Sequence, residues 1–173
     1  MKQVKIIDIA HKILKDHISK DDIIIDATVG NGYDTLFLAS ICKHVYGFDI
    51  QEKAIHETQT KTKDLRNVTL IHDSFENITL HVDKFNGVIF NLGYLPNGDK
   101  SITTLKDTTH KTINQLLNLN NIFILIVVYP GHEEGYLESM MLKDLFSTIS
   151  TPVLKIEIEN RENAPYIYFV NNR

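Results

Sequence analysis

The sequence predicts a doubly wound α/β fold, in which a mostly parallel, seven-stranded sheet carries helices on both faces and ends in a C-terminal β-hairpin. Short apolar runs rich in β-branched residues alternate with longer segments of helical periodicity, and this alternation is typical of βαβ units around a parallel sheet. The end of the chain differs, because 153–158 alternates apolar and charged residues and 166–170 is aromatic and β-branched. That change of pattern predicts the hairpin.

The elements follow in order from their apolar patterns. Val4, Ile7, Ala10 and Leu14 recur at three- and four-residue steps, which predicts an opening amphipathic helix that stops near Ser19. The five strands before the hairpin are expected at 23–25, 45–48, 68–71, 87–90 and 122–128. The helices that follow these strands are expected at 34–41, 51–65, 75–80, 104–119 and 134–149. The run 122–128 is apolar at every position, as expected for a central strand buried on both faces.

Length and composition indicate one globular domain spanning 1–173, because 173 residues with 43% apolar and 23% charged side chains can bury a continuous core. No apolar run approaches the roughly 18 residues of a membrane span. The N-terminus lacks the unbroken apolar stretch of a signal peptide. The single cysteine, Cys42, cannot form an intrachain disulfide. We therefore expect a cytoplasmic protein with no membrane partner.

The net charge of −4 gives no global field that would draw the protein onto nucleic acid. A nucleic-acid partner would need a local basic patch, for which the densest candidate is Lys61, Lys63 and Arg66 with Lys53 nearby. Charges at this spacing more often form a solvated helix face. The eight histidines are scattered without ligand spacing, so no metal site is expected.

The loops after the first four strands are the expected binding site, because ligands of open α/β sheets bind beyond the carboxyl ends of the strands, where the strand order reverses. After the first strand, the Gly-Asn-Gly run at 30–32 leaves two positions free of Cβ beside a helix N-terminus. Asp49 ends the second strand, where a carboxylate can accept hydrogen bonds from both hydroxyls of an adenosine ribose. Asp73 and Ser74 follow the third strand and suit an adenine amino group, although they also form a good helix N-cap.

The stretch Ile-Ile-Ile-Asp-Ala-Thr-Val-Gly-Asn-Gly at 23–32 resembles the glycine-rich first motif of class I S-adenosylmethionine-dependent methyltransferases. The resemblance implies that Asp49 holds the ribose of this cofactor. The third glycine of a dinucleotide-binding motif would fall at Thr35, and Asp34 brings a carboxylate that repels pyrophosphate but can bind an ammonium group, directly or through water. The expected cofactor-binding residues are Asp26, Thr28, Gly30, Asn31, Gly32, Asp34, Thr35, Asp49, Gln51, Asp73, Ser74, Asn91 and Gly93.

The loop after the fourth strand, Asn-Leu-Gly-Tyr-Leu-Pro at 91–96, resembles the Asn/Asp-Pro-Pro-Tyr motif of enzymes that methylate exocyclic or planar nitrogens, with both prolines replaced. Methyl transfer needs an unprotonated nucleophile held in line with the methyl group. Asn91 can accept a hydrogen bond from an amine and orient its lone pair, while Tyr94 can stack on a base or close the pocket. An alkyl amine must first lose a proton, for which Asp99 or His132 can act as base. Asp99 can equally be a turn residue, and His132 can simply orient its own loop.

Three motifs together resemble a narrower family, labelled putative rRNA methylases: Asp-Ala-Thr-x-Gly-Asn-Gly-x-Asp-Thr, Asn-Leu-Gly-Tyr-Leu-Pro and Tyr-Pro-Gly-His-x-Glu-Gly. Members of that family methylate the aminomethyl group of 5-aminomethyl-2-thiouridine at the tRNA wobble position. The resemblance implies an S-adenosylmethionine-dependent enzyme of tRNA modification whose substrate is the anticodon loop, where unstacked bases can be splayed into a pocket. Asn97 departs from the glycine expected in this pattern. Contacts to RNA from Lys100, Lys106 or Lys111 are a hypothesis.

Other functions remain open from the sequence. Within enzymes, the alternative is methylation of rRNA or of a small-molecule amine. From another class, the chain can be a non-catalytic adenosine- or NAD-binding module, against which the missing third glycine and the long loop after the fourth strand both argue. The sequence does not determine the oligomeric state and is compatible with a homodimer.

Overall fold

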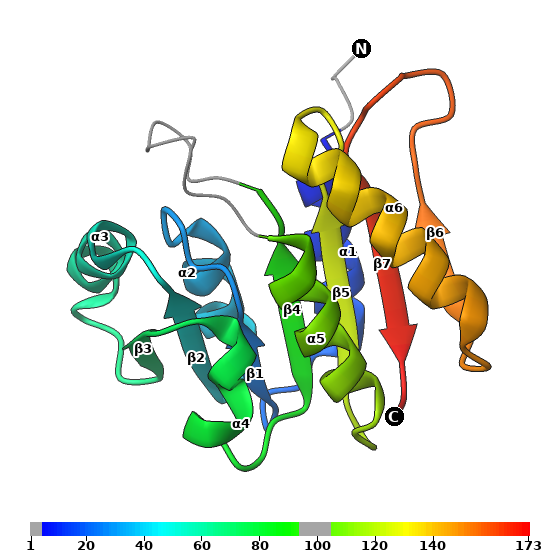
Figure 1. The fold of residues 1–173 in the computed structure, drawn as a ribbon. Coiled ribbons are helices and arrows are strands. Elements are labelled where there is room, and N and C mark those ends of the chain that lie inside the picture. The colour runs from blue at the N-terminus through cyan, green and yellow to red at the C-terminus, as the bar shows by residue number, and fades with distance from the viewer. Residues whose placement is uncertain (1–4, 94–104) are drawn as a thin grey trace.

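A seven-stranded sheet forms the centre of the molecule in the computed structural model, which describes residues 5–93 and 105–173 (Figure 1). The strands lie in the order β3-β2-β1-β4-β5-β7-β6. The pairs from β3 to β5 are parallel, whereas β7 runs antiparallel to both β5 and β6. The elements along the chain are α1 (Ile6–His17), β1 (Ile23–Asp26), α2 (Tyr33–Ile41), β2 (His44–Asp49), α3 (Glu52–Thr62), β3 (Val68–His72), η1 (Phe75–Asn77), α4 (Ile78–His81), β4 (Gly87–Asn91), α5 (Lys106–Leu117), β5 (Phe123–Val128), α6 (Glu133–Thr148), β6 (Val153–Ile156) and β7 (Tyr166–Asn171).

The predicted fold class is confirmed, including the terminal hairpin formed by β6 and β7. The differences lie at the ends of elements; for example, the strand expected at 153–158 ends at Ile156. The helix expected at 75–80 begins as the 3₁₀ turn η1, because the Ser74 hydroxyl accepts a hydrogen bond from the backbone N–H of Glu76 at 3.3 Å and caps this tighter turn. The helix expected at 51–65 ends at Thr62, because the backbone N–H of Leu65 bonds to the Thr62 carbonyl at 2.9 Å in a closing turn.

Helices cover both faces of the sheet and bury a separate apolar cluster on each face. Figure 1 shows α1, α2 and α3 on one side and α4, α5 and α6 on the other. Because successive side chains of a strand point to opposite faces, β5 contributes to both clusters. Ile124 and Ile126 belong to the cluster under α5 and α6, whereas Phe123, Leu125 and Val127 belong to the cluster under α1. The whole of β5 is buried, which confirms the expectation of a central strand covered on both faces.

The order of the strands determines where a ligand can enter. The chain moves from β1 outward to β2 and β3, and then returns to place β4 on the other side of β1. Two backbone bonds continue from the end of β1 to its neighbours, from Ala27 N–H to the Ile89 carbonyl at 2.9 Å and from Val29 N–H to the Phe48 carbonyl at 3.0 Å. The loop after β1 is thereby held between β4 and β2, at the point of reversal where open α/β sheets bind their ligands.

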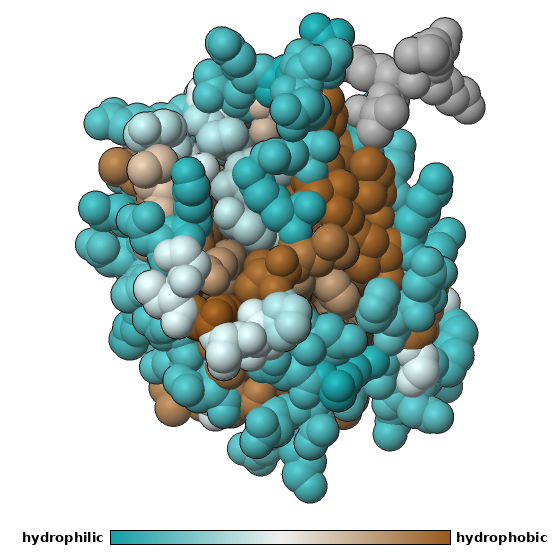
Figure 2. All heavy atoms as spheres, turned by 90° about the vertical axis from the view of Figure 1, so that its right-hand side faces the viewer, coloured by the Kyte–Doolittle hydropathy of each residue, from teal (hydrophilic) through white to brown (hydrophobic). Residues whose placement is uncertain are grey.

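The hairpin strand β6 is the outer edge of the sheet beyond β7. Figure 2, which faces this side of the molecule, shows apolar side chains gathered in a strip within a more polar surround. On β6 itself, Leu154 is 53% exposed. Lys155 beside it forms an ion pair with Glu157, and charged side chains on an edge strand disfavour further strand pairing. Among the described residues, no helix is long and apolar enough to cross a membrane.

A substitution at Gly87 in β4 tests how tightly the side chains on the sheet are packed. Gly87 pairs with Phe123 of β5, and a Cβ at position 87 would lie 2.3 Å from two carbons of the Phe123 ring. We predict that Gly87→Ala lowers the free energy of unfolding by about 2 kcal/mol, because a buried ring must move in a filled core. Urea unfolding measures this loss. Gly131→Ala is the control, since its Cβ would meet its nearest atom at 3.8 Å; equal losses in the two variants would contradict the packing argument.

Candidate functional site

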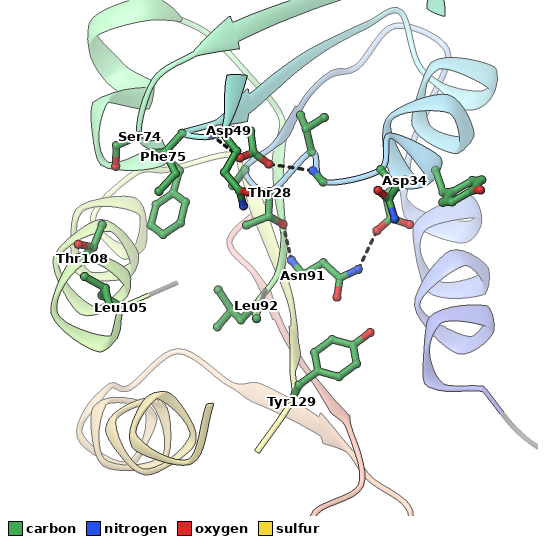
Figure 3. Close-up of a pocket in the computed structure, with 18 of the residues that line it drawn as sticks. Thr28, Asp34, Asp49, Ser74, Phe75, Asn91, Leu92, Leu105, Thr108 and Tyr129 are labelled. Atoms are coloured by element: carbon green, nitrogen blue, oxygen red, sulfur yellow. Dashed lines mark hydrogen bonds between the residues drawn. The ribbon is translucent and has the colours of Figure 1, made fainter. Parts of the chain in front are cut away.

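A cavity of about 610 Å³ opens at the carboxyl ends of the central strands (Figure 3). This volume falls within the range of small-molecule binding sites in proteins. Loops after β1 to β5 form the walls, together with the start of α5 and the end of the hairpin loop. The predicted site residues that line the cavity are Thr28, Gly30, Asn31, Asp34, Asp49, Gln51, Asp73, Ser74, Asn91, Gly93 and His132.

Three predicted cofactor-binding residues, Asp26, Gly32 and Thr35, lie outside the cavity lining. The buried Asp26 carboxylate accepts hydrogen bonds from the Thr35 hydroxyl at 2.6 Å and from the backbone N–H of Thr28 at 3.2 Å. Gly32 has a φ of +77°, and a Cβ there would lie 2.5 Å from the Thr58 hydroxyl oxygen. These residues therefore shape the loop from its inner side, and the glycine is needed for a left-handed turn and close packing.

Asp26 has the most perturbed carboxyl group of this loop. Burial raises its pKa to about 7, and the neighbouring charge of Asp34 adds to this rise. The hydrogen bonds from Thr35 and Thr28 act in the opposite direction, but they do not offset the burial. Near neutral pH the group is therefore divided between its charged and neutral forms.

Asp49 lies at the end of β2 as expected, with its carboxylate beside the glycine-rich loop (Figure 3). One oxygen accepts a hydrogen bond from the backbone N–H of Gly30 at 2.9 Å, and the other accepts one from the backbone N–H of Gln51 at 2.9 Å. Burial raises the pKa of Asp49 above its ordinary value. Because each carboxylate oxygen can accept a second hydrogen bond, the group keeps the capacity to bind two neighbouring hydroxyls. Ile50, which is 56% exposed, adds an apolar wall beside it that sequence reasoning missed.

Asp73 and Ser74 act as a turn and also line the cavity. The Asp73 carboxylate accepts hydrogen bonds from His81 Nε2 at 2.7 Å, from Asn77 Nδ2 at 3.0 Å and from the backbone N–H of Ser74 at 2.7 Å. These donors, His81 first, lower the pKa of Asp73. The capping interpretation is therefore confirmed at Ser74, while both residues remain next to the cavity. Phe75 adds an apolar surface at the same place.

Asn91 ends β4 and is held by two hydrogen bonds (Figure 3). Its backbone N–H donates to the Thr28 hydroxyl at 2.8 Å, and its side-chain Nδ2 donates to Asp34 Oδ2 at 3.1 Å. A carboxylate only accepts hydrogen bonds, so the amide nitrogen must face Asp34. The amide oxygen Oδ1 is therefore turned away from Asp34, on the side of the cavity where Tyr129 lies in Figure 3.

Tyr129, at the end of β5, is a cavity residue that sequence reasoning missed. Figure 3 places its ring next to Asn91. Burial raises the pKa of the Tyr129 phenol, the negative charge of Asp34 raises it further, and a hydrogen-bonding interaction with Asn91 opposes both. The phenol is therefore a neutral hydroxyl at physiological pH. The available signal is the Tyr-Pro-Gly-His motif at 129–132, in which the sequence suggests a role for the histidine alone.

His132 caps the N-terminus of α6, where its Nδ1 accepts a hydrogen bond from the backbone N–H of Gly135 at 3.1 Å. In a neutral imidazole with Nδ1 as acceptor, the proton resides on Nε2. That nitrogen faces Gly93, where an added Cβ would lie 3.9 Å away. The arrangement favours the loop-orienting role of His132 over the role of proton acceptor. Tyr94, Asp99 and Lys100 lie outside the described residues.

One residue of the candidate basic patch at 53–66 reaches the edge of the cavity. Lys61 donates a hydrogen bond to the Asn31 carbonyl at 2.5 Å, and its Nζ lies 4.5 Å from the centroid of the Tyr33 ring. Tyr33 lines the cavity and is 69% exposed. Lys53 instead pairs with Glu57 at 3.9 Å on the surface of α3. In the described ranges, no group of three metal-ligating side chains occurs.

Comparison with known proteins gives consistent matches over most of the chain. The family model described as "Putative rRNA methylase" matches residues 45–172. The chloroplastic tRNA (mnm5s2U34)-methyltransferase of Arabidopsis thaliana is 34% identical over 194 residues, which cover 98% of this chain and 70% of that protein. Ribosomal RNA small subunit methyltransferase H of Clostridium botulinum (strain Okra / Type B1) is 24% identical over 86% of this chain, and the chain spans only 51% of that relative's length.

Two solved structures match the whole chain closely. One is a putative rRNA methylase from Clostridium thermocellum, with a TM-score of 0.91, 33% sequence identity and coverage of 100% of both chains. The other is a putative methyltransferase from Streptococcus mutans in complex with SAH, with a TM-score of 0.88, 29% identity and coverage of 99% of this chain and 100% of that one.

The raised pKa of Asp26 predicts a pH-dependent stability. Between its ordinary value of 3.8 and about 7, the folded state keeps the Asp26 proton while the unfolded state has lost it, so the contribution of Asp26 to stability falls as pH rises through this window. Asn at this position cannot ionise. We predict that Asp26→Asn gains stability relative to the parent protein between pH 5 and pH 8, by on the order of 2 kcal/mol. Urea unfolding at the two pH values measures the gain, and a difference independent of pH would contradict it.

Proposed function

This chain belongs to the "Putative rRNA methylase" family, and we propose that it methylates the aminomethyl nitrogen of 5-aminomethyl-2-thiouridine at the tRNA wobble position, giving 5-methylaminomethyl-2-thiouridine. The observation that carries the proposal is the side-chain oxygen of Asn91, which is turned away from Asp34 at the carboxyl end of β4. It offers a hydrogen-bond acceptor to an amine. The likeness to the Arabidopsis wobble-uridine methyltransferase supports the choice of substrate.

The chain is an S-adenosylmethionine-dependent methyltransferase. The predictions of enzyme class and cofactor are confirmed, because the family relatives are methyltransferases and one close structural neighbour holds SAH. The alternative of a non-catalytic adenosine- or NAD-binding module is therefore not retained. The cavity fits such a cofactor, since it combines a ribose-binding type of carboxylate at Asp49 with apolar walls at Ile50 and Phe75.

The position of each residue on the cavity wall supports its proposed cofactor-binding role. Asp49 would accept hydrogen bonds from the two ribose hydroxyls, and Asp73 with Ser74 would lie beside the adenine. Gly30 and Asn31 allow a close approach to the main chain. The remaining lining residues with a proposed cofactor role are Thr28, Asp34, Gln51, Asn91 and Gly93. Asp26, Gly32 and Thr35 would act indirectly, by holding the loop in shape.

The reaction needs little more than orientation from the protein. The bound cofactor supplies an electrophilic methyl group on a positively charged sulfur. The amine lone pair forms the new N–C bond as the S–C bond breaks, so the amine must be unprotonated when it attacks. Asn91 Oδ1 would accept a hydrogen bond from an N–H of the amine and thereby direct the lone pair toward the methyl group. Asp99 and Tyr94 remain proposed participants outside the described residues.

The surface around the cavity offers contacts for an anticodon loop. Tyr33 presents an exposed ring at the rim of the cavity with the Lys61 cation against it, and aromatic rings with adjacent cations bind unstacked bases and phosphates. Lys106 and Lys111 are exposed on α5, whose first turn lines the cavity through Thr108. These cations would supply the local positive charge that the overall composition lacks.

Transfer of a labelled methyl group to bulk tRNA tests the proposal. The tRNA comes from a strain that lacks this gene, and nucleoside mass spectrometry identifies the product. We expect a gain of one methyl group on 5-aminomethyl-2-thiouridine, while tRNA from the parent strain, already modified, accepts none. Transfer to small ribosomal subunits or to a small amine, with none to tRNA, would overturn the proposed substrate.

Two substitutions separate cofactor binding from catalysis. We predict that Asp49→Ala weakens SAH binding about 100-fold, because two hydrogen bonds to a charged acceptor are lost. Asn91→Ala should change the SAH dissociation constant by no more than about threefold, because Asn91 is only one of several residues proposed to contact the cofactor. It should lower kcat about 100-fold, because it removes the group that orients the acceptor. Calorimetric titration with SAH and single-turnover methyl transfer measure the two effects. Near-normal turnover by Asn91→Ala would show that the assignment of this residue is wrong.

A further inference from the structure

We propose that His11, on the opening helix α1, is a positioning residue for methyl transfer: it holds Asp34, and Asp34 holds the side-chain amide of Asn91 in the orientation that receives the acceptor nitrogen. His11 does not line the cavity. The inference rests on the proposed function only in the role that it gives to Asn91.

A continuous chain of hydrogen bonds links the three side chains. His11 Nε2 lies 2.8 Å from Asp34 Oδ1, and Asn91 Nδ2 lies 3.1 Å from Asp34 Oδ2. Each residue comes from a different element, α1, α2 or β4. The two oxygens of one carboxylate are therefore shared between a donor outside the cavity and a donor within it.

A second contact fixes the ring of His11 in place. The imidazole stacks on the Phe37 ring, with a centroid distance of 3.8 Å and an angle of 5° between the planes. Phe37 lies one turn after Asp34 on α2, so neighbouring positions on the same helix supply both the stacking surface and the carboxylate. The stack sets the plane of the imidazole, and the hydrogen bond sets the direction of Nε2. Two contacts with one helix leave His11 little freedom to turn away from Asp34.

The chemical consequence appears at Asn91. An amide can turn by half a revolution and exchange its oxygen and nitrogen with little steric cost. In the observed orientation the nitrogen faces Asp34, and the oxygen is left for the acceptor amine. In the reversed orientation the amide N–H would donate to the amine lone pair and occupy the electrons that must attack the methyl group. A firmly held Asp34 carboxylate disfavours the reversed form, because it would bring two oxygens face to face.

Asp34 needs this support because it lies in a negatively charged neighbourhood. Its charge raises the pKa of Asp26, so the two carboxyl groups repel each other when both are ionised. The side chain of Asp34 is only 14% exposed, and water can therefore solvate it only in part. The N–H of His11 supplies a hydrogen bond to the oxygen that Asn91 does not use.

A pair of variants at position 11 tests the role of the donor. His11→Phe keeps an aromatic ring over Phe37 but loses the N–H, whereas His11→Gln loses the ring and can place an amide donor near Asp34. We expect His11→Phe to lower kcat about 10- to 100-fold, and His11→Gln to recover most of the activity. The SAH dissociation constant should stay within about threefold, because the Asp34 carboxylate proposed to bind the cofactor is present in both variants. Equal loss in both variants, or loss of SAH binding with unchanged kcat, would overturn the proposal.

A double-mutant cycle tests whether His11 acts through Asn91. In the Asn91→Ala background there is no amide to orient, so adding His11→Phe should change kcat less than about twofold. If His11→Phe lowers kcat by the same factor in both backgrounds, the two residues act independently and the proposed link is wrong.

A spectroscopic measurement separates this proposal from the choice of substrate, since it needs no methyl transfer. The side-chain NH₂ signal of Asn91 can be assigned in a ¹H–¹⁵N spectrum of the full chain by its loss in Asn91→Ala. We expect the signal to shift or broaden in His11→Phe and to stay near its original position in His11→Gln. An unchanged signal in His11→Phe overturns the positioning role, even if tRNA is methylated. A changed signal without methylation of tRNA supports the link and rejects only the proposed substrate.

Discussion

The hydrogen bond from the backbone N–H of Asn91 to the Thr28 hydroxyl, 2.8 Å long, joins the ends of β1 and β4. The order of the strands in the sheet reverses between these two strands. The loop after β1 turns toward β2, whereas β4 lies on the other side of β1. Without a connection, the ends of β1 and β4 would be free to separate beyond the last ladder bond. The Thr28 hydroxyl joins the loop after β1, where we propose that the cofactor binds, to the end of β4, where we propose that the acceptor binds. The distance between the two reactants would therefore depend on this contact. In-line methyl transfer is sensitive to such a distance, because most of its catalysis comes from positioning.

Three carboxyl groups surround the glycine-rich loop, and they differ in burial and in hydrogen-bond partners. Asp26 is fully buried with a pKa raised to about 7, Asp49 is held by two backbone N–H groups, and Asp34 is held by two side chains. Such a concentration of negative charge costs stability in the free protein. It also creates a favourable field for a cofactor that carries a positive charge on sulfur and a second one on its ammonium group. The repulsion among these carboxyl groups in the free protein and the affinity of the site for a cation therefore have the same origin.

The sequence predicts well what depends on local pattern and poorly what depends on long-range contact. The run at 122–128 is apolar at every position because β5 is covered on both faces, and Asp49 was found because it ends a strand. No local sequence pattern indicates a role for His11, because its partner Asp34 lies 23 positions away and Asn91 lies another 57 positions further along the chain. Gly32 and Thr35 belong to a recognisable motif, but their contacts with Thr58 and Asp26 show that a motif residue can shape a loop without lining its cavity.

The orientation of the Asn91 amide also bears on which nucleophile the site can serve. An oxygen that accepts a hydrogen bond favours an acceptor atom with both a hydrogen to donate and a lone pair to attack, which describes an amine or a hydroxyl. An alkylammonium loses its proton near pH 10, by analogy with lysine, whereas water and alcohols hold theirs to a pH above about 15. A hydroxyl would therefore need a strong base at the point of attack. The one histidine that lines the cavity among the described residues uses Nδ1 to cap α6. A site whose described residues orient the acceptor without strongly activating it suits a nitrogen, whose lone pair becomes available once a single, relatively acidic proton has left.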